Sequence, residues 1–188
     1  MKKLRVLVVF SFVVLQVSAQ KYLPQIKPGT ILTYKAESRN TGATADVTLT
    51  IVNITDPLKI KWDIPALGTG FFIMSAKSVK SASQTIAEEP EPDMVTQLDT
   101  NKTLILLSKD TYKSMVENRS FVLNGHTFNV QADTSTLTIN DKRADIIFAT
   151  TPKGHREIWV LNNPAFPIIC KAHKVTPYID FWLTALKE

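Results

Sequence analysis

Residues able to do acid–base or nucleophilic chemistry are few and scattered in this 188-residue chain. It has three histidines, His126, His155 and His173, and one cysteine, Cys170. His126 and His155 fall in or beside predicted turns, where exposed polar residues are usual. Cys170 and His173 are three residues apart, so on a strand their side chains point to opposite faces and form no dyad. Ile168 and Ile169 beside Cys170 favour a buried thiol over a reactive one.

Two further segments suggest chemistry but lack parts that it needs. Asp133-Thr134-Ser135 is similar to the Asp-Thr/Ser-Gly triplet of aspartic proteases, yet the glycine is missing and the triplet occurs once. Residues 88–93 carry four acidic side chains, but two prolines interrupt them and no closing glutamate follows at the Ca²⁺-loop spacing. We interpret residues 88–93 as an exposed loop. The sequence therefore predicts no catalytic residue, no metal site and no cofactor.

The first 19 residues have the pattern of a secretory signal. Three basic residues precede an apolar run over residues 6–15, and Val17-Ser18-Ala19 follows. This order predicts cleavage before Gln20. The apolar run is about half the roughly 20 residues that a membrane span needs. We expect residues 20–188 to form a single β-rich domain in the periplasm or outside the cell, without a membrane span or lipid anchor.

The apparent positive charge of the chain comes mainly from this segment. Three of the 22 basic residues and none of the 17 acidic residues lie within it, which leaves 19 basic against 17 acidic residues, a balance of +2. Net charge governs non-specific attraction to nucleic acid and anionic surfaces. A nearly neutral domain without runs of like charge excludes nucleic acid as the expected partner.

The elements that must position any site are mainly strands. Apolar and polar side chains alternate without a break over residues 58–64, and the same period of two appears over 32–36 and 47–52. The polar, Gly-containing segment 38–42 predicts a hairpin between the latter two.

Four successive hairpins are predicted in the second half, which together indicate a meander. Asn124-Gly125 is the strongest turn signal, because both residues tolerate the positive φ of a type I′ turn. The strand pairs are 121–123 with 127–130, 136–139 with 144–149, 146–150 with 157–161, and 168–172 with 178–185.

Two segments interrupt the strand pattern. Residues 108–116 predict a helix, because Ser108 can cap its first turn and Tyr112, Met115 and Val116 share one face. Residues 75–84 fit either a helix capped by Ser75 or a continuing polar strand. The predicted fold is therefore mainly β, a curved antiparallel meander sheet or half-barrel with one or two short helices packed on one face.

Large apolar side chains lie on both faces of the late strands. Phe181, Leu183 and Ala185 share one face of the last predicted strand, while Trp182 lies on the other. In the predicted strand over residues 157–161, Trp159 lies on the face opposite to Ile158 and Val160. An antiparallel sheet with one solvated face carries large apolar groups on one side only.

Two arrangements explain this pattern. Either the helix over residues 108–116 covers the second face, or the curled sheet encloses an apolar cavity. In the second arrangement we expect Trp62, Phe148, Trp159 and Phe181 to be the ligand-binding residues.

Several segments resemble an uncharacterised family of exported bacterial proteins. They are residues 74–77, residues 107–109 with the helix that follows, residues 123–128, and above all Glu157-Ile158-Trp159-Val160-Leu161-Asn162-Asn163-Pro164-Ala165-Phe166-Pro167-Ile168-Ile169. That family is similar to the TapB-like and LolA-like curved β half-barrels. The likeness covers most of residues 60–186; its link to the LolA-like proteins rests on architecture and on the Trp-containing late hairpin. LolA-like domains bind acyl chains or lipoproteins in a concave sheet, so the resemblance implies a soluble carrier but transfers no site residue.

The sequence thus predicts an exported, non-enzymatic binding domain that shelters a lipid, another apolar small molecule or a protein segment. One alternative is an envelope interaction or scaffold protein with a filled core and no ligand cavity. Another is an enzyme of unrecognised class, for which the three histidines would be the first residues to test.

Overall fold

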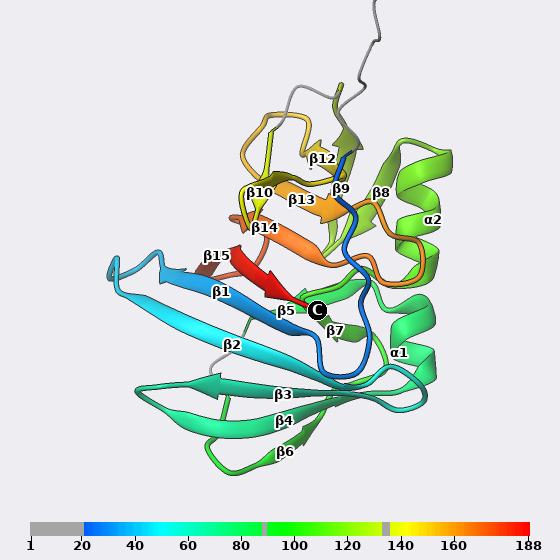
Figure 1. The fold of residues 1–188 in the computed structure, drawn as a ribbon. Helices are drawn as coiled ribbons and strands as arrows, with labels where there is room; N and C mark the ends of the chain where they lie inside the picture. Colours follow the sequence, from blue (N-terminus) through cyan, green and yellow to red (C-terminus); the bar gives the residue numbers. More distant parts are fainter. Residues whose placement is uncertain (1–20, 88–89, 133–135) are drawn as a thin grey trace, which may run out of the picture.

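A curved sheet of eleven strands is the framework of the computed structural model, which describes residues 21–87, 90–132 and 136–188 (Figure 1). The predicted signal segment, Glu88-Glu89 and the triplet Asp133-Thr134-Ser135 lie outside the described residues. The strands of the sheet are β1 (Ile31–Ser38), β2 (Thr44–Asn53), β3 (Leu58–Ile64), β4 (Gly68–Met74), β6 (Val95–Gln97), β8 (Ser120–Leu123), β9 (His126–Val130), β12 (Ile146–Thr150), β13 (Glu157–Leu161), β14 (Ile169–His173) and β15 (Ile179–Lys187).

Neighbouring strands follow the order β6-β4-β3-β2-β1-β15-β14-β13-β12-β9-β8. Every neighbouring pair is antiparallel except β4 and β6, which are parallel. The predicted mainly β, antiparallel fold is confirmed. The β1–β15 pairing joins the two halves of the chain at the middle of the sheet.

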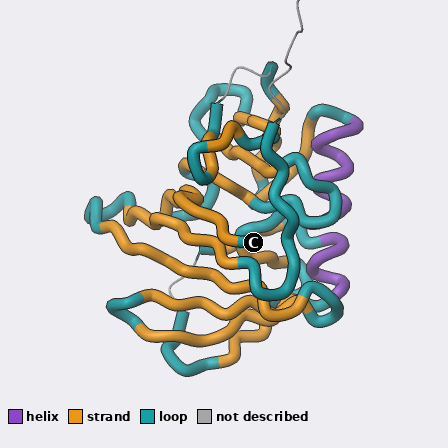
Figure 2. The backbone as a smooth tube through the Cα atoms, in the orientation of Figure 1, coloured by secondary structure: helices purple, strands orange, loops and turns teal. Residues whose placement is uncertain are grey.

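The smaller elements lie on the inner side of the sheet or at its margin. They are β5 (Gln84–Ile86) and β7 (Lys102–Leu104), which pair parallel, the hairpin β10 (Thr138–Ile139) and β11 (Lys142–Arg143), and helices α1 (Ala76–Ser81) and α2 (Lys109–Glu117). Figure 2 shows the two helices stacked one above the other along one side of the sheet. Neither helix, and no other in the described part of the chain, is long and apolar enough to cross a membrane.

Both helices begin where a serine can cap them. Ser75 Oγ accepts from the Ser78 amide at 3.2 Å and caps helix α1. Of the two structures predicted for residues 75–84, the helix is therefore the one that forms after Ser75. Ser108 Oγ accepts from the Thr111 amide at 3.3 Å and caps the predicted helix α2. The apolar stripe of α2 is narrower than predicted, because Val116 is 47% exposed.

The hairpins of the second half form with one exception. Asn124 and Gly125 adopt φ values of 51° and 75°, as a type I′ turn between β8 and β9 requires. The predicted pairing of residues 136–139 with 144–149 is wrong, because only the two-residue strands β10 and β11 pair there. Strand β12 pairs instead with β9 and β13, so the meander skips the β10–β11 hairpin.

The described sheet has register shifts between β1 and β15, between β13 and β14, and between β2 and β3 at Ile51/Asn53, and the first two bear on the buried face of the late strands. The register between β1 and β15 shifts at Thr33/Tyr34, so the predicted apolar face of β15 ends at Leu183. Beyond this bulge Ala185 is exposed, and Leu186 is buried in its place. The register between β13 and β14 shifts at Trp159/Val160, which leaves Cys170 as the extra residue. Its thiol is free and fully buried, as its apolar neighbours predict.

Candidate functional site

An apolar cavity with a volume of ≈ 420 Å³ lies between the inner face of β1–β4 and the chain around β5 and β7. No Asp, Glu, Lys, Arg or His among the described residues lines it. We call this space the apolar cavity, and its volume falls within the roughly 300–1,000 Å³ range of small-molecule sites. The large side chains that line it are Tyr34, Val47, Leu49, Trp62, Ile64, Leu67, Phe72, Ile86, Leu104, Ile105, Ile179 and Phe181.

Small side chains create the space. Ala36 on β1 lies opposite Ala45 on β2 and Phe181 on β15, and Ala66 and Ala87 also line the cavity. A larger residue at these positions would project into the cavity. Because Ala43, Ala45 and Ala66 are exposed whereas Leu49, Trp62 and Leu104 are buried, the cavity opens to solvent near the start of β2 and the β3–β4 turn.

Trp62 forms the deep part of the wall and is fixed by its contact with Gly70. The two residues are cross-strand partners on β3 and β4, and Trp62 is 1% exposed. A Cβ added at Gly70 would lie 2.7 Å from the indole ring, so only glycine lets the ring lie this close to the backbone. The indole Nε1 is buried and has no acceptor among the described residues, a cost of about 1–3 kcal/mol.

The Tyr34 hydroxyl is a second buried polar group in the wall, and Tyr34 is 2% exposed. Its hydroxyl donates to the Ile169 carbonyl oxygen at 3.0 Å, and the ring packs edge-on against Phe181 with centroids 5.9 Å apart. Burial raises the pKa of Tyr34 well above its usual value, and the nearby Cys170 raises it further. Burial likewise raises the pKa of the Cys170 thiol to about 12. Both groups are neutral at physiological pH, so this wall is uncharged.

The predicted ligand-binding residues separate into two pairs. Trp62 and Phe181 line the apolar cavity. Phe148 and Trp159 lie outside its lining, as neighbours on β12 and β13, with ring centroids 4.6 Å apart. Lys171 Nζ lies 4.5 Å from the centroid of a Trp159 ring.

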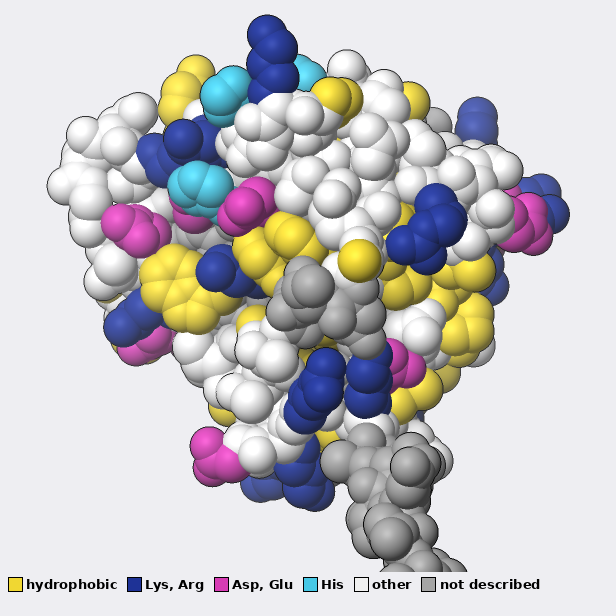
Figure 3. Space-filling view, turned by 90° about the horizontal axis from the view of Figure 1, so that it is seen from above, with side chains coloured by type: hydrophobic (Ala, Val, Ile, Leu, Met, Phe, Trp, Pro, Cys, Tyr) yellow, Lys and Arg dark blue, Asp and Glu magenta, His cyan; other side chains and the backbone are white. Residues whose placement is uncertain are grey.

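The second pair belongs to a row across the outer face. The row runs through directly opposed residues, from Phe148 through Trp159 and Lys171 to Trp182. Figure 3 shows a face on which hydrophobic side chains lie in separate patches among Lys and Arg side chains. On this outer face Phe148 and Trp159 stack on each other, and Lys171 lies over the Trp159 ring.

An apolar cavity is present, and helix α2 packs beside β8 rather than over the outer face of the late strands, as the first of the two predicted arrangements required. Helix α2 buries Tyr112 and Met115 beside β8, and the Tyr112 hydroxyl donates to Asn162 Oδ1 at 2.8 Å. The apolar cavity occupies the other half of the sheet, under β1–β4. Tyr34, Leu49 and Phe72 are lining residues that the sequence reasoning did not select, although the alternation on β1 and β2 places Tyr34 and Leu49 inward.

A polar groove with a volume of ≈ 740 Å³ borders the apolar cavity. Ile86 and Ala87 line both spaces. Arg39, Lys102, His126, Arg156 and Lys174 contribute basic side chains, and no carboxylate among the described residues lines the groove. We call this space the basic groove.

Asp180 does not line the basic groove but binds residues at one end of it. Its carboxylate accepts from the Lys174 amide at 2.7 Å and from Arg39 Nη1 at 2.8 Å, and His173 Nδ1 lies 2.5 Å away. Burial alone would raise the pKa of Asp180, but the hydrogen bonds from Lys174, Arg39 and His173 outweigh it and lower the pKa below its usual value. The carboxylate therefore holds the β14–β15 loop against Arg39.

The three histidines do not form a common site. His126 is exposed and lines the basic groove, His155 is exposed in the β12–β13 loop, and His173 contacts Asp180. Within the described residues, no group of three His, Cys, Asp or Glu side chains could hold a metal ion.

Comparison of the chain with family models, curated proteins and solved structures finds no match. The apolar cavity and the basic groove are therefore the features from which a function is inferred. An uncharged apolar space next to a cationic surface can remove an apolar chain from water and hold a polar group at its end.

Proposed function

We propose that this protein is an exported, non-enzymatic binding protein that shelters an apolar chain, such as the acyl chain of a lipid, in the apolar cavity. One observation carries the proposal, namely a cavity of ≈ 420 Å³ whose described lining has no charged side chain. Large uncharged cavities are rare in protein interiors, which are otherwise close-packed. An apolar occupant restores the contacts that the wall residues otherwise lack.

The volume of the cavity suggests the size of the occupant. A methylene group occupies about as much space as a water molecule in the liquid, roughly 30 Å³, so the cavity holds about a dozen methylene groups. Each buried methylene contributes about 0.8 kcal/mol, which is about fourfold in affinity. We expect affinity to rise with chain length and to level off once the cavity is full.

The sequence supports the same role. The resemblance to LolA-like half-barrels implies acyl-chain binding on a concave sheet, and the signal pattern over residues 1–19 predicts export. A carrier of this kind would act in the periplasm or outside the cell.

The proposal is tested by extracting lipid from the purified protein for mass spectrometry and by titrating the protein with a fluorescent fatty acid. Val47→Phe on β2 would place a ring in the apolar cavity. Val52→Phe on the same strand is the matched control, because Val52 is 42% exposed and lies outside the lining. We expect Val47→Phe to weaken fatty-acid binding at least about tenfold and Val52→Phe to leave it unchanged.

Absence of extracted lipid together with no saturable uptake would contradict the proposal. If a pull-down then recovered a protein partner while lipids left the melting temperature unchanged, the interaction or scaffold alternative would replace it. If an activity were found, substitution of His126, His155 and His173 would test the enzyme alternative.

A further inference from the structure

The basic groove begins where the apolar cavity opens to solvent. Three chain segments pass from one space to the other. At two of them neighbouring residues are divided, because Ser38 and Ile179 line the cavity whereas Arg39 and Tyr178 line the groove. At the third, Ile86 lines both spaces. Ser38 leads into the β1–β2 turn, beside the exposed start of β2 where the cavity opens. A chain held in the cavity would therefore place its polar end near the groove.

Within the part of the chain that the structure describes, two cations of the groove have no partner for their charge. The Arg156 backbone is fixed by hydrogen bonds with Thr151, but its buried Nε has no acceptor and the side chain forms no ion pair within the described residues. The Lys174 amide donates to Asp180, yet the Lys174 ammonium has no carboxylate partner there either. By contrast, Arg39 pairs with Asp180 and Lys102 pairs with Asp99.

The groove is held in shape independently of these two cations. The Asn124 side chain accepts from the Thr85 amide at 2.9 Å and donates to the Thr85 and Val175 carbonyl oxygens at 3.1 and 3.0 Å. These three bonds join β5, the β8–β9 turn and the β14–β15 loop. A site whose walls are already fixed loses little conformational entropy when it binds a ligand.

We propose that the ligand is an anionic amphiphile whose chain occupies the apolar cavity and whose carboxylate or phosphate head is bound in the basic groove by Arg156 and Lys174. This inference rests on the proposed apolar-chain function and adds the charge of the head group. An arginine fork and a lysine ammonium both form charge-assisted hydrogen bonds with such heads.

The test compares ligands with one chain and different heads. Dodecanoate, dodecyl phosphate and uncharged dodecanol would compete with a fluorescent fatty acid for the wild-type protein at low and high salt. We expect the better of the two anions to bind about ten- to a hundredfold more tightly than dodecanol, and salt to reduce that preference. The anion with the larger preference identifies a fatty-acid or a phospholipid type of head.

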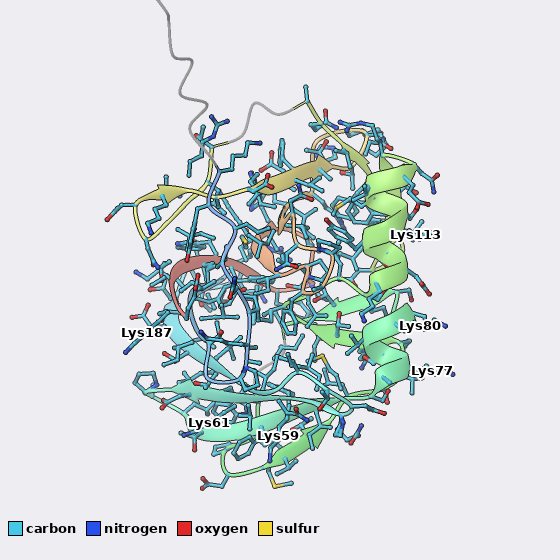
Figure 4. All side chains as sticks on the ribbon, turned by 45° about the vertical axis from the view of Figure 1, so that its right-hand side comes forward. Lys59, Lys61, Lys77, Lys80, Lys113 and Lys187 are labelled. Carbon is cyan, nitrogen blue, oxygen red and sulfur yellow. The ribbon has the colours of Figure 1, made fainter. Side chains whose placement is uncertain are left out.

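The double variant Arg156→Gln/Lys174→Gln should lose the preference for the anions and keep the affinity for dodecanol. Its matched control is Lys77→Gln/Lys80→Gln, which removes the same charge from the exposed outer side of α1 (Figure 4). The control should keep the preference.

Each contrary outcome has a distinct meaning. Equal binding of anions and dodecanol, or a preference that survives in the Arg156/Lys174 variant, overturns the head-group inference and leaves the apolar-chain function standing. Absence of binding by all three ligands overturns both.

Discussion

The two halves of the sheet share one curvature but differ in what fills their inner face. Under β8, β9 and β12–β14, aromatic and branched side chains fill the space, and Phe121 stacks on Phe128 with centroids 5.3 Å apart. Helix α2 adds Met115, which is 1% exposed. Under β1–β4 the inner face carries alanines such as Ala36 and Ala45, and the apolar cavity lies there.

We attribute the apolar cavity to the small side chains in its lining, because the strands are continuous through both halves of the sheet. Both halves are continuous sheet, antiparallel except for the β4–β6 pair, and one cluster of buried residues runs through them. The filled half provides packing energy for the whole sheet. The hollow half lacks part of that packing energy because the apolar cavity lies there.

The largest expected effect is a difference in unfolding free energy between equivalent substitutions in the two halves. Phe128→Ala in the filled half should cost about 3–5 kcal/mol of unfolding free energy. Phe181→Ala should cost about half as much, because one side of that ring already faces the cavity and has fewer contacts to lose. Urea unfolding of both variants measures the difference, and equal costs would contradict a hollow region beside Phe181.

Gly70→Ala should perturb the cavity wall specifically. The added Cβ would meet the Trp62 ring and the Met94 carbonyl oxygen, each at 2.7 Å, so we expect a loss of about 1–3 kcal/mol and displacement of the indole. Tryptophan fluorescence should change in this variant. Gly154→Ala, in an open turn at φ 66°, is the control that strains the backbone without moving Trp62, and a similar spectral change in both would refute the contact.

Acid should weaken the attachment of the β14–β15 loop that borders the groove. The pKa of Asp180 is lowered in the folded protein, so its stabilising contribution is complete above the unfolded-state pKa of about 3.9 and is lost as pH falls through the lower folded value. Asp180→Asn should therefore flatten the fall in stability below about pH 4. The measurement is the melting temperature of the wild-type protein and of Asp180→Asn across that pH range. An equal fall in melting temperature for both proteins would show that Asp180 does not contribute to stability.

The smallest effect is expected at Cys170. Burial raises the pKa of its thiol to about 12, so the native protein should not react with a thiol reagent at neutral pH. Denaturant should expose one reactive thiol per chain. Rapid labelling of the native protein would mean that the β13–β14 bulge opens readily.

Local patterns predicted the elements but not their long-range arrangement. The alternation over residues 58–64 corresponds to β3, Asn124-Gly125 forms the predicted turn, and Ser108 caps α2. The parallel pairs β4–β6 and β5–β7 and the β1–β15 pairing join distant segments, which local periodicity does not encode. The extra residue of a bulge also leaves no mark in the alternation, as Ala185 and Leu186 show.

The candidate site was predictable only in part, for a related reason. Large aromatic side chains suggested a cavity, and two of the four selected, Trp62 and Phe181, line it. Phe148 and Trp159 are equally large but stack outside the cavity. The space itself depends on small residues from several separate segments, and their meeting follows from the tertiary fold.

Calorimetric titration with dodecanoate would measure whether the space under β1–β4 binds an apolar chain. For the wild-type protein we predict saturable one-site binding with a negative heat-capacity change, the mark of buried apolar surface. For Val47→Phe we predict at least about tenfold weaker binding, with Val52→Phe unchanged. Superimposable isotherms for the wild-type protein and Val47→Phe would contradict the account.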